Sequence, residues 1–445
     1  MPELRPFRGI RYNQEAVGDI SLVVTPPYDV ISQEERDFYY NRHPYNVIRL
    51  ILNRKSRTDK DENAPYKRAA EFFSRWFAQR ILIRDSIPGI YIYRQRYILE
   101  SEYKECTGLV ARVRLEEFGN SGILPHEEIM PKPFKDRMKL LEKTMASFDL
   151  VHSLYSDPEE KLKEPILGEM ERFPICQFQT KDGIAHDIWL VNDENFIRKV
   201  IRFFKKKKLY IADGHHRYQT ALEYSKRILQ SGTGQGEDDP RHFIAMMIVE
   251  MENPGLSVLP VHRVVLKREI IEHEALIRLL ERWFYVSEVE VPRGARSGQV
   301  YHLLNLLKKT GEEAKAFGVF LHEPDKFLLL VWRQENDPER VVEGEYSNLY
   351  KNLDVTVLHK VVFEKALGIP GDRDSVEKNI MFTRDPLEAV KKVESGSASI
   401  VFFLNPTKIE QVRELADKGE RMPQKSTYFY PKPFSGVIMS KITEW

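Results

Sequence analysis

The first part of the chain combines two hydrophobic patterns. Apolar residues recur at helical spacing in YKRAAEFFSRWFAQRIL, residues 66–82, and this spacing predicts an amphipathic helix. Residues 89–99 (GIYIYRQRYIL) and 108–118 (GLVARVRLEEF) alternate between apolar and polar positions, which predicts two antiparallel strands. We therefore expect an α+β region over residues 1–120.

The middle of the chain, residues 121–266, places a short apolar strand directly before a helix. KLYIA, residues 208–212, predicts a buried strand, and the positions of Tyr218, Ala221 and Leu222 mark one face of the helix that follows. A strongly apolar stretch at residues 243–251 predicts a further strand.

From residue 267 the pattern becomes an alternation of helices and strands, which predicts a second α/β domain over residues 267–420. The tail, residues 421–445, breaks this alternation with RMPQKSTYFYPKPFSGVIM. A polar and aromatic segment bounded by prolines is an unusual end for an α/β domain unless the segment packs against another part of the protein. We therefore expect the tail to return to the active-site cleft.

Composition narrows the class of protein. The chain has 445 residues, enough for two or three domains, with 42% hydrophobic and 30% charged residues, as in ordinary globular proteins. The formal net charge of +1 is too small to attract nucleic acid or an anionic membrane by overall electrostatics. Two cysteines, Cys106 and Cys176, are too few for a disulfide framework or a four-cysteine zinc site. The absence of a signal-like start and of a membrane-spanning apolar run predicts a cytoplasmic protein.

Five candidate binding residues lie where the predicted strand becomes a helix: Asp213, Gly214, His215, His216 and Arg217. The first turn of a helix has unpaired N–H groups and a partial positive charge. Gly214 lets the backbone approach a ligand closely, and His215, His216 and Arg217 add hydrogen-bond donors. The motif therefore predicts an anion site, most naturally for phosphate.

The carboxylate of Asp213 conflicts with a phosphate site unless a cation lies between them. Mg²⁺ takes one or two carboxylates together with phosphate oxygens. The motif therefore predicts a magnesium–nucleotide complex in which Asp213 is the metal ligand. The alternative is that Asp213 caps the helix and that the histidines form hydrogen bonds with backbone groups. For a single residue we favour that alternative, but five such residues together favour function.

Three other clusters of polar residues, here called polar islands, are candidate catalytic or binding sites. His126 and Glu127 in LPHEEIMPKPFKDR place a carboxylate beside a histidine, which suits a general base, although a solvated loop is equally compatible. His262 and Arg263 are adjacent in a predicted strand, so only one is expected to face a site, and a core histidine is the commoner outcome. Lys425, Ser426 and Thr427 offer a cation and two hydroxyls for phosphate or carboxylate. The sequence contains neither a P-loop nor a Gly-x-Ser-x-Gly motif.

These islands together resemble the DUF1015 proteins of bacteria and archaea. The resemblance rests on five blocks, TPPYDVI, HEEIMPKPFKDR, YIADGHHRYQTA, LPVHR and MPQKSTYFYPK. Three blocks also resemble the free-serine kinases of the ParB/sulfiredoxin-like superfamily. Their counterparts here are Pro125-His126-Glu127, Asp213 to Arg217, and Pro423 to Thr427, where Gln424 is an extra residue.

The resemblance implies a ParB/sulfiredoxin-like catalytic domain with an N-terminal extension and a second α/β domain. It also implies a kinase that moves phosphate from ADP or ATP to the hydroxyl of free L-serine, giving O-phosphoserine, or to a similar small metabolite. Glu127 would be the base, assisted by His126, and residues 213–217 would hold nucleotide phosphates and metal. His262, Arg263 and residues 425–427 would contact substrate.

Two rival functions remain beside the kinase. A ParB-like, nucleotide-dependent DNA-binding protein would need a basic helix-turn-helix region and a positive face, and the net charge of +1 argues against nucleic acid as a partner. A regulatory nucleotide sensor without turnover is the second rival. A sulfinic-acid reductase is excluded, because that chemistry needs a cysteine where this chain has His215.

Overall fold

The computed structural model describes residues 1–445 except residues 58, 120–121, 129–130, 235, 267–271 and 323–324. The chain divides into two compact units, which are described one at a time. Unit 1 comprises Met1–Ser257 and Phe429–Trp445, and unit 2 comprises Val258–Tyr428. Both units mix helices and strands, which confirms the predicted α/β class. The ParB/sulfiredoxin-like assignment stays a prediction.

This division differs from the four regions expected from the sequence. The expected boundary at residues 120–121 lies outside the described residues, as does residue 267. Strands from both sides of residue 120 form one sheet, because β5 (Glu102–Arg114) pairs with β12 (Phe243–Glu250). The tail also divides, since Phe429–Trp445 belongs to unit 1 and the residues before it belong to unit 2.

Unit 1 is built on a nine-stranded sheet with the order β6-β11-β8-β12-β5-β4-β10-β9, and β1 pairs with β5 outside this path. The remaining strands of this sheet are β1 (Leu4–Arg5), β4 (Ile90–Leu99), β6 (Ile123–Pro125), β8 (Val151–Tyr155), β9 (Cys176–Gln179), β10 (Ala185–Val191) and β11 (Leu209–Asp213). Two short ribbons complete the unit, one of β2 (Ile10–Tyr12) with β3 (Leu82–Arg84) and one of β7 (Ala146–Ser147) with β21 (Ser440–Lys441). The two predicted antiparallel strands are confirmed as the hairpin β4–β5, although β5 begins at Glu102 and ends at Arg114 instead of spanning residues 108–118.

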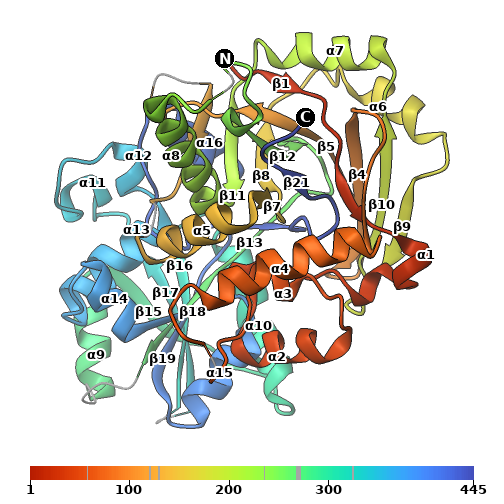
Figure 1. The fold of residues 1–445 in the computed structure, drawn as a ribbon. Helices are drawn as coiled ribbons and strands as arrows, with labels where there is room; N and C mark the ends of the chain where they lie inside the picture. The colour runs from red at the N-terminus through yellow and green to blue at the C-terminus, as the bar shows by residue number, and fades with distance from the viewer. Residues whose placement is uncertain (58, 120–121, 129–130, 235, 267–271, 323–324) are drawn as a thin grey trace. The chain divides into compact units, whose positions relative to one another are not determined.

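The helices of unit 1 are α1 (Gln14–Val17), α2 (Gln33–Arg42), α3 (Ile48–Ile51), α4 (Ala64–Ala78), α5 (Pro131–Thr144), α6 (Lys163–Met170), α7 (Glu194–Phe204) and α8 (His215–Ser231). The helical spacing noted for residues 66–82 is confirmed by α4. Helix α4 packs against α5, and α5 packs against α8 (Figure 1). Apolar residues of α7 and α8, including Val200 and Leu222, form one core with alternate strand residues such as Ile92 and Val113.

The C-terminal tail packs against the other set of alternate residues in β4 and β5. Gln95 Nε2 donates to the Lys432 carbonyl oxygen at 3.0 Å, and Arg112 Nη2 donates to the Ser440 hydroxyl at 2.8 Å. Neighbouring residues of a strand point to opposite faces, so the tail covers the face opposite the α7–α8 core. It forms part of the unit and buries Ile438 and Met439 almost completely.

Unit 2 contains a six-stranded sheet with the order β15-β17-β16-β19-β14-β18. Its strands are β14 (His262–Leu266), β15 (Phe284–Glu288), β16 (Ala316–Leu321), β17 (Lys326–Trp332), β18 (Ile380–Thr383) and β19 (Ala398–Phe403). Its helices are α9 (His273–Leu280), α10 (Arg296–Thr310), α11 (Pro338–Val341), α12 (Asn348–Lys351), α13 (Asp354–Val357), α14 (Arg373–Asn379), α15 (Pro386–Glu394) and α16 (Ile409–Asp417), with a π-helix at Leu358–Ala366. Strands β13 (Ser257–Leu259) and β20 (Tyr428–Tyr430) contain the two points where the chain passes between units.

Two observations bear on the expected class of protein. Among the described residues, every helix is too short or too polar to cross a bilayer. Cys106 and Cys176 are both free thiols, and burial raises the pKa of Cys106 to about 12.

Replacing Ile438 in the tail tests whether the tail is part of the core of unit 1. Ile438 is 1% exposed, so Ile438→Ala should lower the free energy of unfolding by about 2–5 kcal/mol, measured by urea denaturation. Ile98→Ala is the control, because Ile98 is 74% exposed and its loss should cost less than about 1 kcal/mol. Equal effects of the two substitutions would show that the tail is only loosely attached.

Candidate functional site

Two adjacent parallel strands bring two of the polar islands to one edge of the unit 1 sheet. In the β6–β11 pair, Leu209 lies opposite Ile123 and Ile211 lies opposite Pro125. Both strands therefore end at the same edge, with His126 and Glu127 following β6 where Asp213 ends β11. Because β6 and β11 are parallel, these residues lie at the same end of the sheet as the first turn of α8, and this end is the candidate site.

His126 and His215 connect the two turns at this edge. His126 Nδ1 lies 2.7 Å from the carbonyl oxygen of Ile211, and because a carbonyl only accepts, Nδ1 carries the proton. The backbone N–H of His126 donates to His215 Nε2 at 3.3 Å, and the two rings meet edge to face with centroids 4.8 Å apart. These contacts fix the turns to each other. The expected roles of His126 in catalysis and of His215 in phosphate binding stay predictions.

Glu127 lies beside this histidine pair. Its side chain is 23% exposed, so a bound molecule could reach it, whereas His126 is only 1% exposed. Glu127 Oε1 is 4.0 Å from His126 Nε2, which is too long for a hydrogen bond. The pair is therefore in proximity without the direct bond that a histidine-assisted base would require.

The carboxylate of Asp213 is buried between two cations. Arg217 Nη2 donates to Asp213 Oδ2 at 2.5 Å, and Lys432 Nζ bonds Oδ1 of the same side chain. Asp213, Arg217 and Lys432 are each less than 10% exposed. We refer to these three residues as the Asp213 triad, and its formal charge is +1 when all three are ionised.

Lys432 was not among the candidates from the sequence, although it closes the MPQKSTYFYPK block. The residues chosen from that block were Lys425, Ser426 and Thr427, because a cation beside two hydroxyls suggested a binding site. A lysine after Tyr-Pro carried no such signal. A partner 219 positions away in the chain could have been suspected only from the expected return of the tail.

The triad sets the charge state of its members. Burial would raise the pKa of Asp213, but the charges of Lys432 and Arg217 hold that pKa below its ordinary range. His152 lies opposite Asp213 in β8 and is completely buried, and this burial lowers its pKa to about 4 despite the nearby carboxylate. At neutral pH, Asp213 is therefore ionised and His152 is neutral.

Gly214 allows Arg217 to fold back over its own turn. Gly214 has φ = +88°, and a Cβ atom there would lie 2.9 Å from Arg217 Cζ. Arg217 Nη1 also donates to the Leu150 carbonyl oxygen at 2.5 Å. The N-cap of α8 is Gly214, so the alternative in which Asp213 caps this helix is not what the structure adopts.

The arrangement around Asp213 does not fit the metal ligand expected from the sequence. Both carboxylate oxygens bond cationic groups, and a divalent ion at either oxygen would be repelled by Arg217 and Lys432. Across the part of the chain that the structure describes, His, Cys, Asp and Glu side chains form no cluster of three or more that could hold a metal. The expected use of Mg²⁺ thus stays a prediction without protein donors at this position.

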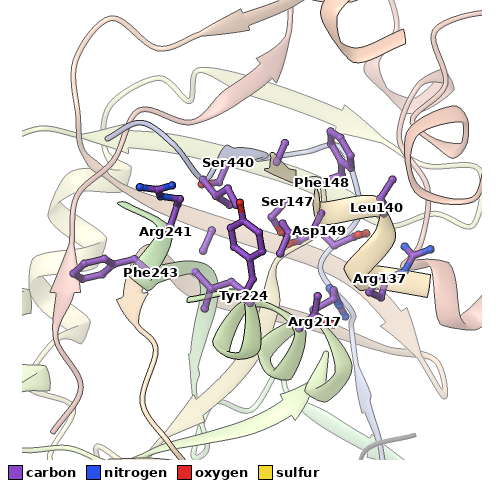
Figure 2. Close-up of a pocket in the computed structure, with 17 residues that line it drawn as sticks. Arg137, Leu140, Ser147, Phe148, Asp149, Arg217, Tyr224, Arg241, Phe243 and Ser440 are labelled. Atoms are coloured by element: carbon purple, nitrogen blue, oxygen red, sulfur yellow. The ribbon is translucent and has the colours of Figure 1, made fainter. Parts of the chain in front are cut away.

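The TPPYDVI block also contributes to the surroundings of the triad. The guanidinium of Arg137 lies over the ring of Tyr28 at 3.9 Å. Burial raises the pKa of Tyr28, and the nearby charges of Arg137 and Arg217 oppose this rise. Figure 2 shows Arg137, Asp149 and Arg217 together at one side of a small cavity of about 50 Å³. A block from residues 25–31 and the Asp213 turn therefore belong to the same region of unit 1.

The expected substrate residues lie in unit 2. His262 and Arg263 are adjacent in β14 and both are buried, so both faces of this strand are covered. The expectation that only one of them faces a site stays a prediction. His262 Nδ1 accepts from the Leu404 N–H at 3.3 Å, as a core histidine would. Arg263 Nη2 donates to the Lys425 carbonyl oxygen at 3.1 Å. Arg263 therefore supports the backbone of the segment that contains Ser426 and Thr427, whose substrate role stays a prediction.

Comparisons with known proteins support a family but not an activity. A family model described as "Protein of unknown function (DUF1015)" matches residues 4–356. No curated protein matches the chain.

Several solved structures are similar to parts of the chain. A free serine kinase in complex with AMP is 13% identical with a TM-score of 0.33, and the match covers 71% of this chain and 88% of that one. A conserved hypothetical protein from Pyrococcus furiosus is 15% identical with a TM-score of 0.34, covering 72% and 92%. SbnI with a C-terminal truncation from Staphylococcus aureus is 12% identical with a TM-score of 0.32, covering 72% and 82%. Similarity at this level carries no argument about activity.

Removing the charge of Lys432 should destabilise the protein in a pH-dependent way. Lys432→Gln leaves one oxygen of buried Asp213 without its cation, so the free energy of unfolding at pH 7 should fall by about 1–3 kcal/mol. A carboxyl whose pKa is depressed on folding contributes stability above its unfolded pKa, about 3.9, and loses that contribution as the pH falls. The gap between the variant and the unmodified protein should therefore narrow below about pH 4 in urea titrations.

Lys441→Gln is the matched control for this experiment. Lys441 lies in the same tail, but its ion pair with Glu444 is exposed, so its loss should cost less than about 1 kcal/mol at any pH. A gap for Lys432→Gln that does not change with pH would show that the ionisation of Asp213 does not depend on Lys432.

Two glycines allow the packing of Arg217 to be tested separately from backbone strain. Gly214 and Gly232 both have positive φ, but of the two only Gly214 has atoms within 4 Å of the point where an added Cβ atom would lie. Gly214→Ala should therefore lower the free energy of unfolding by about 1–3 kcal/mol more than Gly232→Ala, because it displaces Arg217 from Asp213. Equal losses in urea denaturation would mean that Arg217 has room to move.

Proposed function

The chain belongs to the DUF1015 family, and we propose that it is a nucleotide-dependent phosphotransferase acting on the hydroxyl of a small molecule. The observation that carries the proposal is the parallel pairing of β6 with β11. This pairing brings a partly exposed carboxylate, Glu127, to the same sheet edge as the amino-terminal end of α8. A base for the acceptor and an anion-binding helix end are the two parts that phosphoryl transfer requires at one place.

The phosphate groups of ADP or ATP would bind at the first turn of α8. This helix runs from His215 to Ser231, long enough for its N-terminus to carry a partial positive charge. The Asp213 triad behind the turn adds a net positive charge in a buried setting, where charges act more strongly than in water. His216, which is partly exposed on the first turn, is the side chain best placed to contact a phosphate oxygen.

Arg217 has a different role in this proposal from the one expected from the sequence. Its guanidinium is buried and already donates to Asp213 and to the Leu150 carbonyl oxygen. It would therefore orient the turn and supply positive potential rather than grip a phosphate directly. Lys432 would act in the same way from the C-terminal tail.

The chemical step would transfer the terminal phosphoryl group to an oxygen of the acceptor. As the new P–O bond forms, the bond to the nucleotide's bridging oxygen breaks, and Glu127 takes the proton of the attacking hydroxyl. The nucleotide leaves with one phosphate fewer, as AMP from ADP or as ADP from ATP. The positive field of the α8 turn would stabilise the charge on the transferring group.

Free L-serine is the proposed acceptor, with O-phosphoserine as the product. The support is the resemblance of three sequence blocks, including Pro125-His126-Glu127, to the free-serine kinases. Residues 425–427 would contact the acceptor in this proposal, which rests on the resemblance alone. Incubation with ADP, ATP or pyrophosphate and a pool of hydroxyl metabolites, followed by ³¹P NMR, would identify both donor and acceptor. Nucleotide binding without any phosphorylated product would favour the regulatory sensor instead.

Glu127 is the residue that decides between catalysis and simple nucleotide binding. Glu127→Gln keeps the size of the side chain and removes the base, so turnover should fall by about 10²–10⁴-fold. Nucleotide affinity, measured by isothermal titration calorimetry, should stay near normal, because the proposed phosphate contacts lie on the α8 turn.

Glu128→Gln is the internal control, since Glu128 is adjacent, equally acidic and more exposed. Its turnover should stay within a few-fold of normal, as expected for an exposed side chain away from the chemistry. If Glu128→Gln were the inactive variant and Glu127→Gln retained full activity, both the base and the correspondence with the kinase segment would be wrong.

A further inference from the structure

Unit 1 contains a second, larger cavity that the proposed phosphotransfer does not use. Its volume is about 480 Å³, within the range of about 300–1,000 Å³ that is typical of small-molecule pockets. Helices α2, α3, α4 and α5 and the segment between α3 and α4 supply its lining, and no member of the Asp213 triad is among the lining residues. The cavity is therefore distinct from the triad in composition.

The acidic side chains that line this cavity already have cationic partners. None of them needs a cation from a ligand, because each has a hydrogen bond or an ion pair within the unit. The pairs are Asp37 Oδ1 with Arg54 Nε at 2.8 Å, Glu62 Oε1 with Lys139 Nζ at 2.9 Å, and Asp136 Oδ2 with Arg137 Nε at 2.8 Å.

Two arginines of the lining each keep one donor nitrogen without a hydrogen bond, although Arg137 also bonds Asp136 and the Ile51 carbonyl oxygen through its other nitrogens. Arg137 is 6% exposed, and its Nη1 has no hydrogen-bond partner among the described residues. The side chain of Arg36 is 25% exposed, but its Nε atom is buried without a hydrogen bond, because the Asp37 carboxylate oxygen lies 3.7 Å away and bonds Arg54. Unpartnered buried donors cost free energy, and a ligand that brings acceptor oxygens would satisfy both.

Part of the lining is apolar, beside the acidic side chains and the polar side chains of Asn53, Arg54, Lys55 and Tyr66. Leu50, Leu52 and Ala69 line the cavity together with the two arginines, and Ala69 is completely buried in α4. A fully hydrated inorganic ion would leave this apolar surface uncovered. A molecule with an anionic group and a short apolar portion would match both parts of the lining.

The geometry points to a second binding site in unit 1, for a small organic anion whose carboxylate or phosphate group meets Arg36 and Arg137. This site is independent of the proposed phosphotransfer and would exist whether or not the protein transfers phosphate. Arg137 also lines the small cavity that Arg217 borders, and its guanidinium points away from the centre of that cavity (Figure 2). A ligand on Arg137 would therefore contact the residue that separates the two cavities.

Calorimetric titration of the full-length protein tests the site with four probes. Hexanoate and phenyl phosphate carry an anionic group and an apolar portion, whereas hexanamide and phenol are their neutral counterparts. At least one anion should bind with a Kd of about 1 mM or tighter, and its neutral counterpart should bind at least tenfold more weakly. The anion that binds distinguishes a carboxylate site from a phosphate site. Saturating ADP should not displace it.

Two variants place the binding in this cavity. Arg36→Gln should weaken the bound anion about tenfold or more, the usual effect of losing a charged hydrogen bond. Arg42→Gln is its control, because Arg42 lies on the same helix, α2, outside the lining. Ala69→Leu should abolish binding by filling the cavity, with circular dichroism showing that the fold is intact.

Three outcomes would overturn the inference. They are the failure of both anions to bind, equal binding of an anion and its neutral counterpart, and unchanged anion binding in Arg36→Gln. Displacement by ADP would overturn the separation of this site from the nucleotide site.

Discussion

The structure of the candidate site depends on one buried carboxylate. Asp213 ends strand β11 under almost complete burial, where an unpaired charge would be too costly to keep. Arg217, four residues later, and Lys432, from the far end of the chain, make that charge tolerable. The left-handed Gly214, the folded-back arginine and the return of the tail all help to meet this requirement. Replacing Asp213 would leave two buried cations facing each other, and replacing either cation would leave one carboxylate oxygen without its partner.

The same constraint explains why an acid stands in the middle of a cationic motif. The sequence suggested that a metal ion separates Asp213 from phosphates, whereas the structure separates it with protein cations. Because both oxygens of Asp213 already accept hydrogen bonds from Arg217 and Lys432, Asp213 has little remaining capacity to bind a ligand. It serves the site by fixing where positive charge lies, and electrostatic preorganisation of this kind is a large contribution to many enzymes.

The sequence predicted those features that depend on local periodicity. The helix α4, the hairpin β4–β5 and the strand β12 were visible because packing against a sheet imposes a period of two or 3.6 residues. The strand-to-helix turn at Gly214 was visible for the same reason. The order of the strands was not predicted, because pairings such as β6 with β11 join segments far apart and leave no local signal.

Residues that act through charge pairing or burial were harder to predict. Lys432 was missed because its partner is far away in the sequence, and the bond from Arg263 to the Lys425 carbonyl oxygen likewise joins segments that no local pattern relates. Tyr28 and Arg137 lay in two of the sequence blocks, but nothing in either block alone indicated that an arginine would stack on that tyrosine. Such contacts are properties of the assembled fold, so local patterns could suggest the blocks but not their partners.

The discontinuous composition of unit 1 has a consequence for how the protein is made. Domains generally fold as units in the order of their synthesis, from the amino terminus onward. Unit 1 cannot follow that order, because residues 429–445 supply part of its core and Lys432 supplies a charge of the triad. A nascent chain that has released all of unit 2 still carries Asp213 without its lysine. The Asp213 triad can therefore be completed only after the whole of unit 2 has been synthesised.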